Sequence, residues 1–323
     1  MPPPPRVEVV HVGSAARDIA PEDPRGWRLG GGVTYAALTT TRLGLRTAAI
    51  VGVDAEAGRA HELEMLRDAG VDILRVELAE SPVFHNVETP TGRVQKVVAR
   101  GIPVPLVPLP ASWLSAAAWS LVPVADEVGD GWADRPAPDA VVAVAWQGML
   151  RRLVAGEHVE RSAPTGRALL RRADLVGLSH LDVAPETTIE ELTAHLHPGA
   201  RLLVTQGGKG GLLVSTSAGG PPEVLNYLPA PTDREVDPTG AGDTFLAALL
   251  ATLVRPGVMG PGGGPLARGL RFAAAAGSLA VEGVGLHGVP DRRAVLRRRA
   301  RERVRRAVQP SLSARVGVED PRQ

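Results

Sequence analysis

Short apolar runs rich in Val and Leu alternate along most of the chain with longer segments in which apolar residues recur at helical spacing. Residues 7–12 form a β-branched run that predicts a buried strand, and residues 33–43 and 55–69 predict helices closed by glycines. Further strands are predicted at residues 48–53, 119–122, 139–144, 174–178 and 201–205. Strand followed by helix, repeated in this way, predicts a mostly parallel sheet covered on both faces.

Two parts of the chain depart from this alternation. Residues 83–99 contain two alternating segments around Thr89-Pro90-Thr91-Gly92, a pattern that predicts a β-hairpin. Residues 211–215 and 223–228 predict antiparallel strands near one edge of the sheet. The sheet is therefore expected to be mixed at that edge, with the hairpin outside it.

The C-terminal part is predicted to be helical. Two Ala-rich helices are expected at residues 244–254 and 266–282, with a mobile Gly/Pro-rich loop between them. Residues 292–306 carry many arginines at helical spacing and predict a solvated helix, because no aromatic residue is interleaved as in a nucleic-acid site. Residues 308–323 are expected to be a disordered tail.

Composition narrows the class of protein. The chain of 323 residues has a net charge of +1, which gives no general attraction to nucleic acid or to an anionic membrane. No apolar run is long enough to cross a bilayer and the first residues lack a secretory signal, so a cytoplasmic protein is expected. Cysteine is absent, which excludes disulfides, thiolate metal sites and a cysteine nucleophile.

The segment Asp237-Pro-Thr-Gly-Ala-Gly-Asp243 carries the clearest chemistry, because it leads directly into an apolar helix. The small residues Gly240, Ala241 and Gly242 allow backbone N–H groups to approach an anion, and the helix adds the positive end of its dipole. Asp243 would stay ionised beside these amides and could accept a proton from an attacking hydroxyl. The same spacing also fits an ordinary aspartate that caps a helix after a glycine turn.

These residues resemble the second signature of the PfkB/ribokinase family of carbohydrate kinases, and further stretches match in order over about residues 7–296. The resemblance implies a single ribokinase-like kinase domain over residues 1–323, an α/β fold with a doubly wound, mostly parallel sheet and helices on both faces. It also implies a small β-lid formed by about residues 19–30 and 83–100. The implied activity is phosphotransfer from ATP to an alcohol group of a small sugar or polyol, with Asp243 as general base and Gly240, Ala241 and Gly242 as the anion hole.

The resemblance assigns further site residues by their place in the family's pattern. The acceptor would be bound by Asp18, Gly31, Gly32 and Glu127. The nucleotide and its Mg²⁺ would lie near Thr205, Gly207, Gly208, Lys209, Gly210, Ser179 and Asp182. A monovalent cation such as K⁺ would be held near Asp237, Thr239, Ala280 and Gly285. A homodimer formed through the lid is also compatible with the resemblance.

The sequence departs from the family's pattern at two places. Ser179-His-Leu-Asp182 stands where family members often carry Asn-x-x-Glu near the magnesium. Thr34-Tyr35 stands where many sugar kinases place an asparagine that contacts the substrate. The acceptor therefore stays open among a ketose, a pentose, an inositol and a nucleoside, although Gln147-Gly-Met-Leu-Arg151 resembles an inositol-kinase-like subgroup.

Three other classes of protein were weighed. A nicotinamide-dependent oxidoreductase should carry Gly-x-Gly-x-x-Gly after the first strand, and Gly13-Ser-Ala-Ala-Arg-Asp18 does not fit. A P-loop kinase is excluded in the same way, since Gly-x-x-x-x-Gly-Lys-[Ser/Thr] is missing. A non-catalytic sugar- or nucleotide-binding protein on a kinase scaffold stays as an alternative because of the altered Ser179–Asp182 segment.

Overall fold

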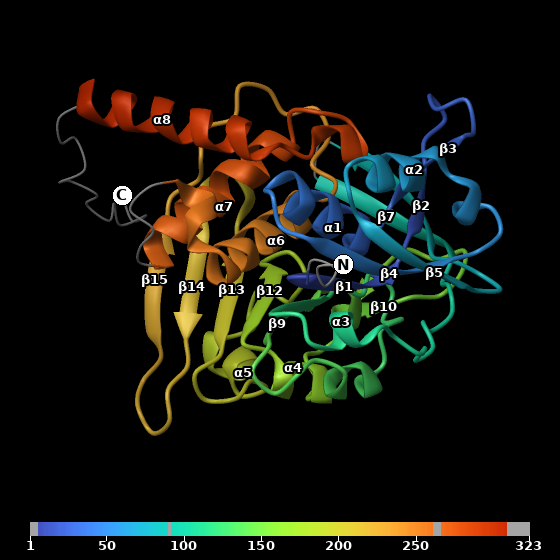
Figure 1. Cartoon of the computed structure of the whole chain (residues 1–323), viewed down its shortest axis with the longest axis horizontal. Helices are drawn as coiled ribbons and strands as arrows, with labels where there is room; N and C mark the ends of the chain where they lie inside the picture. Colours follow the sequence, from blue (N-terminus) through green and yellow to red (C-terminus); the bar gives the residue numbers. More distant parts are fainter. Residues whose placement is uncertain (1–5, 90–91, 261–265, 309–323) are drawn as a thin grey trace, which may run out of the picture.

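A nine-stranded sheet forms the centre of the molecule in a computed structural model that describes residues 6–89, 92–260 and 266–308 (Figure 1). Its order is β15-β14-β13-β12-β9-β8-β1-β4-β5, and the strands from β13 to β5 run parallel. The strands are β1 (Val9–Ser14), β4 (Thr47–Val53), β5 (Asp72–Glu77), β8 (Ala118–Leu121), β9 (Val141–Ala145), β12 (Leu175–Ser179), β13 (Arg201–Thr205), β14 (Gly211–Ser215) and β15 (Glu223–Tyr227). The predicted α/β class, the parallel sheet and the antiparallel edge are confirmed.

Helices cover both faces of this sheet, as predicted (Figure 1). One face packs against α1 (Gly32–Arg42), α2 (His61–Asp68), α6 (Ala241–Val254) and α7 (Leu266–Ala280). The other face packs against the shorter helices α3 (Ala111–Leu114), α4 (Ala168–Arg172) and α5 (Ile189–Thr193). Alternate residues of each strand enter the two cores: Ala49 and Val51 face the first, and Ile50 faces the second.

A second, four-stranded sheet lies beside the carboxyl end of β1, in the order β3-β2-β6-β7. It consists of β2 (Ala16–Ile19), β3 (Trp27–Gly30), β6 (Val83–Thr89) and β7 (Gly92–Ala99). The hairpin expected over residues 83–99 is present, with residues 90–91 of its turn outside the described residues. The other arm begins at Ala16 rather than at residue 19, so Asp18 lies on a strand of this small sheet.

Several element boundaries differ from the sequence prediction. The segment 55–69 is a 3₁₀ turn over Ala57–Arg59 followed by α2, because Ala60 adopts an extended conformation between them. Helix α6 begins at Ala241, which makes Asp243 its third residue. The arginine-rich helix is α8 (Arg292–Val308), which packs on α7. Residues 261–265 of the predicted mobile loop and residues 309–323 of the predicted tail lie outside the described residues.

The strand order contains one reversal, between β1 and β8. From β1 the chain proceeds outward to β4 and β5, and then returns to β8 on the other side of β1 before continuing to β9, β12 and β13. In open α/β sheets ligands bind outside the carboxyl ends of the strands at such a reversal. The loops that follow Ser14 and Leu121 are therefore the expected place of a ligand-binding site.

Candidate active site

The N-terminus of α6 lies at the carboxyl edge of the sheet and presents free backbone amides. Gly240 precedes the helix in a left-handed conformation (φ 75°), which a side chain would strain. The amide of Ala241 donates to the carbonyl of Pro238 at 3.3 Å, and that of Thr244 donates to Gly240 at 2.9 Å. Within the described chain the Gly242 amide has no backbone acceptor, and a Cβ atom placed on Gly242 would meet nothing within 4 Å. The approach to this amide is therefore open.

The Asp243 carboxylate lies in the first turn of α6 and faces the start of α1. Its Oδ1 atom is 2.9 Å from the position of a Cβ atom on Gly32, so a side chain there would displace the carboxylate. Burial raises the pKa of Asp243 to about 6; Arg151 opposes this shift and the charge of Asp182 adds to it. The sequence led us to expect an ionised carboxylate, and at neutral pH most of the population is ionised despite the raised value.

The residues expected to bind an acceptor lie around this carboxylate. Gly31 and Gly32 form the N-terminus of α1, and Gly31 (φ 98°) lies so close to Ser14 that a side chain would clash. Asp18 accepts a hydrogen bond from the Asn86 amide at 2.9 Å, and its other oxygen lies beside Gly30. The structure thus brings Asp18, Gly31, Gly32 and Asp243 to one side of the sheet.

Glu127 lies buried beside the carboxyl ends of β1 and β8, with an exposed fraction of 2%. Its carboxylate accepts backbone N–H bonds from Ser14 at 3.0 Å, Val124 at 3.0 Å and Ala125 at 2.8 Å. Burial raises the pKa of Glu127, while these hydrogen bonds favour its ionised form. Both oxygens are engaged by the main chain, so Glu127 joins the ends of β1 and β8 into one floor.

The loop that carries Glu127 is held in an uncommon conformation. Asp126 has a positive φ of 59°, the single non-glycine residue with positive φ in the described part of the chain. Arg167 fixes this loop from outside through ion pairs with Asp126 at 2.8 Å and Asp130 at 3.0 Å.

Asp182 lies where the sequence departs from the family's pattern. One of its oxygens accepts the Ser179 amide at 2.7 Å and the other accepts the side-chain amide of Gln147 at 3.0 Å. Asp182 has a side chain one methylene shorter than the glutamate of the family's pattern. Its carboxylate is held in place by Gln147, which follows the neighbouring strand β9. Carboxylate oxygens fit a hard cation such as Mg²⁺, which proteins commonly bind through one or two carboxylates together with substrate phosphates.

The predicted nucleotide segment is the tight turn between β13 and β14. Gln206 donates to Gly210 at 2.8 Å, and residues Gly207–Lys209 form a 3₁₀ turn. Gly207, Gly208 and Lys209 are exposed, and Cβ atoms on the two glycines would meet nothing within 4 Å. Thr205 lies beside the Asp182 turn, since its carbonyl accepts the His180 amide at 3.0 Å. The turn after β13 therefore lies at the same carboxyl edge of the sheet as the Asp182 turn after β12.

The four residues expected near a monovalent cation also come together. The Asp237 carboxylate accepts the Thr239 amide at 2.9 Å and the Gly285 amide at 2.9 Å. The Val236 amide donates to Val281, the neighbour of Ala280, at 2.7 Å. Carboxylate and carbonyl oxygens are the ligands that a hard cation takes. No group of three or more His, Asp and Glu side chains arranged for a metal ion occurs in the described ranges.

Arg151 belongs to the site although the sequence did not identify it as a site residue. It begins the short strand β10 (Arg151–Arg152), directly after the turn Gln147–Leu150. Burial lowers the pKa of Arg151, and four carboxylates oppose that shift: Asp182, Asp243, Asp18 and Glu127, in order of effect. The signal was present in the segment Gln147–Arg151, but only the fold shows which acids this arginine faces.

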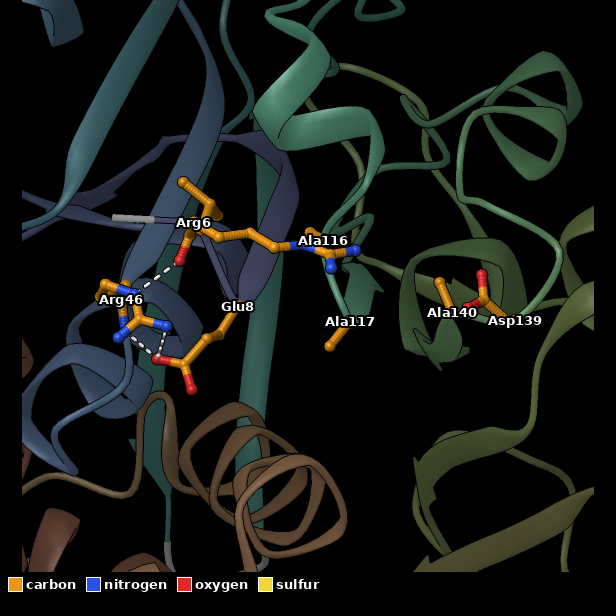
Figure 2. A pocket seen from close by; sticks show the side chains of 8 residues that line it. Arg6, Glu8, Arg46, Ala116, Ala117, Asp139 and Ala140 are labelled. Atoms are coloured by element: carbon orange, nitrogen blue, oxygen red, sulfur yellow. Dashed lines mark hydrogen bonds and ion pairs between the residues drawn. The ribbon is translucent and has the colours of Figure 1, made fainter. Parts of the chain in front are cut away.

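A cavity of about 250 Å³ lies at the opposite edge of the sheet (Figure 2). It is lined by residues that precede β1, β4, β8 and β9, among them Glu8, Arg46 and Asp139. Figure 2 shows the Arg46 guanidinium turned toward Glu8 and the main chain of Arg6. The amino ends of the strands meet here, so this cavity is separate from the site around Asp243.

No helix in the described ranges combines the length and apolar character that a membrane-spanning segment needs.

Comparison of the whole chain with solved structures identifies the fold. Arabidopsis thaliana ribokinase complexed with ribose and ATP aligns with a TM-score of 0.65 at 22% identity, covering 91% of this chain and 98% of that one. A pyrophosphate-dependent kinase in the ribokinase family, complexed with a pyrophosphate analog and myo-inositol, aligns with a TM-score of 0.66 at 18% identity, covering 89% and 98%. The chain therefore has the ribokinase-like α/β fold.

Sequence comparison matches part of the chain to one family. Residues 150–292 match the model of the pfkB family carbohydrate kinases. Ribokinases of Arabidopsis thaliana and Bacillus subtilis are 36% and 42% identical over 126 and 112 residues, which are 37% and 34% of this chain. The matched segments span about a third of those relatives' own lengths, 30% and 33%. These matches support the resemblance to the PfkB/ribokinase family that the motifs indicated, over the part of the chain that they cover.

Proposed function

We propose that the protein transfers the γ-phosphoryl group of ATP to a hydroxyl group of a small sugar or polyol. The observation that supports this most is the position of Asp243. Its carboxylate lies in the first turn of a helix whose Gly242 amide is open to approach, and it faces the Gly32 end of a second helix. A base next to anion-binding amides is what direct phosphoryl transfer requires.

In this mechanism Asp243 accepts the proton of the acceptor hydroxyl as its oxygen attacks the γ-phosphorus. The bond between that phosphorus and the β–γ bridging oxygen breaks, and ADP leaves. The amides at the start of α6, from Gly240 to Gly242, stabilise the charge on the transferred group; the open Gly242 amide is the best placed, because the Ala241 amide is shared with Pro238. Positioning and electrostatics supply most of the catalysis.

The remaining site residues divide by the ligand that they would hold. Asp18, Gly31 and Gly32 bind the acceptor, and the exposed turn at Gly207–Lys209 binds the nucleotide, with Lys209 near its phosphates. Asp182 and Ser179 hold Mg²⁺, which would neutralise the phosphates when bound. Because the main chain engages both oxygens of Glu127, its role is to position the crevice floor rather than to contact the acceptor.

Asp237, Thr239, Ala280 and Gly285 are proposed to hold a monovalent cation such as K⁺, whose charge would support the loop before α6. The small sheet β3-β2-β6-β7 is proposed to close over the acceptor and limit hydrolysis of the donor. The homodimer and the cytoplasmic location stay predictions from the sequence.

A coupled assay of nucleoside-diphosphate release against panels of sugars, polyols and nucleosides tests this function. We expect acceptor-dependent ADP release and a phosphorylated product with at least one sugar or polyol. Pyrophosphate is included as a second donor, with orthophosphate release as its readout, because one ribokinase-fold neighbour is a pyrophosphate-dependent kinase. Donor consumption at background with every acceptor and both donors would instead favour the non-catalytic binding protein, and activity confined to nucleosides would favour a nucleoside kinase.

A further inference from the structure

The loop that follows β8, residues 122–130, packs directly against the segments that carry the candidate active site. A Cβ atom on Gly13 would lie 2.9 Å from the Val122 carbonyl oxygen, and one on Gly32 would lie 3.1 Å from the Val122 Cβ atom. The main chains therefore touch with no room for a side chain between them. Because Gly32 also faces the Asp243 carboxylate, the position of this loop is coupled to the distance between α1 and α6.

The Glu127 side chain closes this loop onto β1. Its carboxylate accepts the amides of Ser14, Val124 and Ala125, at 3.0, 3.0 and 2.8 Å. The Glu127 carbonyl accepts the Val104 amide at 2.9 Å, from the segment that leads out of the small sheet. Displacement of Glu127 would therefore release the loop from β1 and from that segment together.

The backbone of the preceding residue sets the direction in which Glu127 leaves the chain. Asp126 has a φ of 59°, within the left-handed region that favours glycine. An aspartate enters this region more readily than most residues, but the right-handed and extended conformations are still favoured over it. A contact from outside the turn is therefore needed to hold Asp126 as it is.

Arg167 makes that contact. Its Nη1 atom donates to Asp126 at 2.8 Å and its Nε atom donates to Asp130 at 3.0 Å, so one guanidinium joins two points of the loop. Burial raises the pKa of Asp130, but hydrogen bonds from the Ala168 amide and from Arg167 outweigh it and lower the pKa. The loop is thus fastened to the start of α4, on the side away from β1.

We propose that Arg167 is a positioning residue of the candidate active site, which holds Asp126 in the left-handed conformation from which Glu127 reaches the carboxyl end of β1. The effect on turnover rests on the proposed kinase function, whereas the effect on the loop rests on the contacts alone. Arg167 itself lies outside the site and contacts neither substrate. Without it the loop would move away from β1 and shift α1 relative to Asp243.

The consequence should fall on the acceptor rather than on the donor. The loop contacts Ser14 and Gly32, beside the residues proposed to bind the acceptor. The turn at Gly207–Lys209, proposed to bind the nucleotide, follows β13, which β9 and β12 separate from β8. A displaced loop should therefore lower kcat/KM for the acceptor and leave the donor KM almost unchanged.

Two substitutions at Asp126 separate its conformation from its charge. D126A and D126G both remove the ion pair with Arg167, but only alanine resists a positive φ. Amide hydrogen exchange, followed by mass spectrometry on peptides that contain Ser14, Val124 and Ala125, measures how readily the loop opens without any substrate. We expect these amides to exchange about 5–30-fold faster in D126A than in D126G, the factor by which a left-handed alanine is disfavoured.

Substitution of Arg167 tests the same contact from the other side. R167M should speed the exchange of these amides about 2–30-fold, as for the loss of two partly exposed ion pairs. The matched control is R171M, which removes an exposed arginine from α4 and should leave that exchange at the wild-type rate.

Kinetics then connects the loop to the reaction. We expect D126A and R167M to lower kcat/KM for the acceptor by about 10–100-fold, because a small displacement of reacting groups is enough for such a loss, with the donor KM changed less than about threefold. D126G should lose clearly less than D126A, which a role confined to charge would not produce.

Equal exchange in D126A and D126G, or in R167M and R171M, would overturn the inference whatever the activity. Exchange that changes as expected while the acceptor and donor parameters fall together, or do not fall, would show that the loop does not position the site. A wild type that phosphorylates no acceptor would refute the proposed function instead, and the exchange rates would still decide whether Arg167 holds the loop.

Discussion

Asp243 is placed so that its surroundings act on its carboxylate in opposite directions. Burial and the charge of Asp182 raise its pKa, whereas Arg151 and its own backbone amide lower it, and the balance lies at about 6. A general base is most effective when its pKa lies near the working pH, because it is then ionised and still basic enough to take the proton. The surroundings of Asp243 therefore suit a base that works at neutral pH.

The pH profile of the reaction follows from this value. Only the ionised form of Asp243 can accept the proton, so kcat/KM for the acceptor should rise with pH and reach half its maximum near pH 6. Below that point it should fall about tenfold per pH unit. The measurement varies the acceptor at saturating donor between pH 4.5 and pH 8. A half-maximum near pH 4, the ordinary range for an aspartate, would contradict the effect of burial.

At this scale the sequence predicted part of the site. Asp243 and Gly240–Gly242 were selected as candidates because their spacing implies a glycine turn and a helix start, and because the segment resembles a family signature. Arg151 could not be assigned a role, since its partners come from four separate segments that only the sheet order brings together. Gln147 was missed as the partner of Asp182 for the same reason.

At the scale of elements, the hairpin of β2 and β3 is tied to the body of the molecule through Glu62 on α2. Its carboxylate accepts two hydrogen bonds from Arg25, at 2.6 and 2.8 Å, and one from the Leu29 amide at 3.2 Å. The Trp27 ring lies beneath the Arg25 guanidinium, 4.5 Å from it. A closing movement of the small sheet would therefore involve the β6–β7 hairpin more than this arm.

We expect E62Q to lower the free energy of unfolding at pH 7 by about 1–3 kcal/mol, as for loss of buried, charge-assisted hydrogen bonds. Burial by itself raises the pKa of Glu62, but Arg25 and the backbone amides outweigh it and lower the pKa below 4.5. The stabilisation by Glu62 is therefore present above the ordinary pKa of 4.5 and is lost as the pH falls through the lowered pKa of the folded state. The difference in free energy of unfolding between E62Q and the wild type should accordingly shrink in acid.

Urea unfolding at pH 7 and in acid measures this gap. The matched control is E64Q, on the same helix, whose exposed carboxylate pairs with Arg67. Surface pairs of this kind contribute about 0–1 kcal/mol. Equal destabilisation by both variants, or a gap that does not change with pH, would show that Glu62 is not the tie described here.

The strands differ in how well the sequence predicted them. Long apolar strands such as β4 and β13 were predicted almost to the residue, because parallel strands buried on both faces read as continuous apolar runs. Strand β5 was missed, since it is an edge strand with charged and partly exposed residues. Strands β2 and β3 were expected only through the resemblance, as the lid at about residues 19–30, because four residues are too few to show a period.

At the scale of the whole molecule, an ion pair near the C-terminus connects α8 to the segment that leads into the candidate active site. Arg298, 7% exposed, donates to both oxygens of Glu282 at 2.8 Å. Glu282 also accepts the Asp233 amide at 2.7 Å and the Thr232 hydroxyl at 3.0 Å. The path from Thr232 to Gly240 has no regular structure of its own, so this contact fixes its beginning.

R298M should destabilise the protein by about 3–5 kcal/mol, because it leaves Glu282 half-buried without its partner. Thermal unfolding compares it with R297M, which removes the adjacent, exposed arginine of α8. A melting temperature for R298M equal to that of R297M would mean that the pair contributes nothing to the fold.

The overall architecture was predictable because its signals are local and repeated: strands and helices alternate, and the family's motifs occur in order. The reversal of strand order between β1 and β8 was not visible in any single segment, and it is this reversal that places Asp18, Glu127, Arg151 and Asp243 around one crevice. The central claim is that these groups and the amides of α6 act together on a phosphoryl group and its acceptor.

Turnover of D243N, followed as phosphorylated product, tests that claim most directly. The control is D72N, which removes an exposed carboxylate from the edge strand β5. D243N should lose about 10²–10⁴-fold in kcat, keep its affinity for ATP, and be at least as stable as the wild type, because it no longer buries an ionised group. D72N should keep wild-type turnover. Near-normal turnover in a folded D243N would contradict the assignment of the base and, with it, the proposed mechanism.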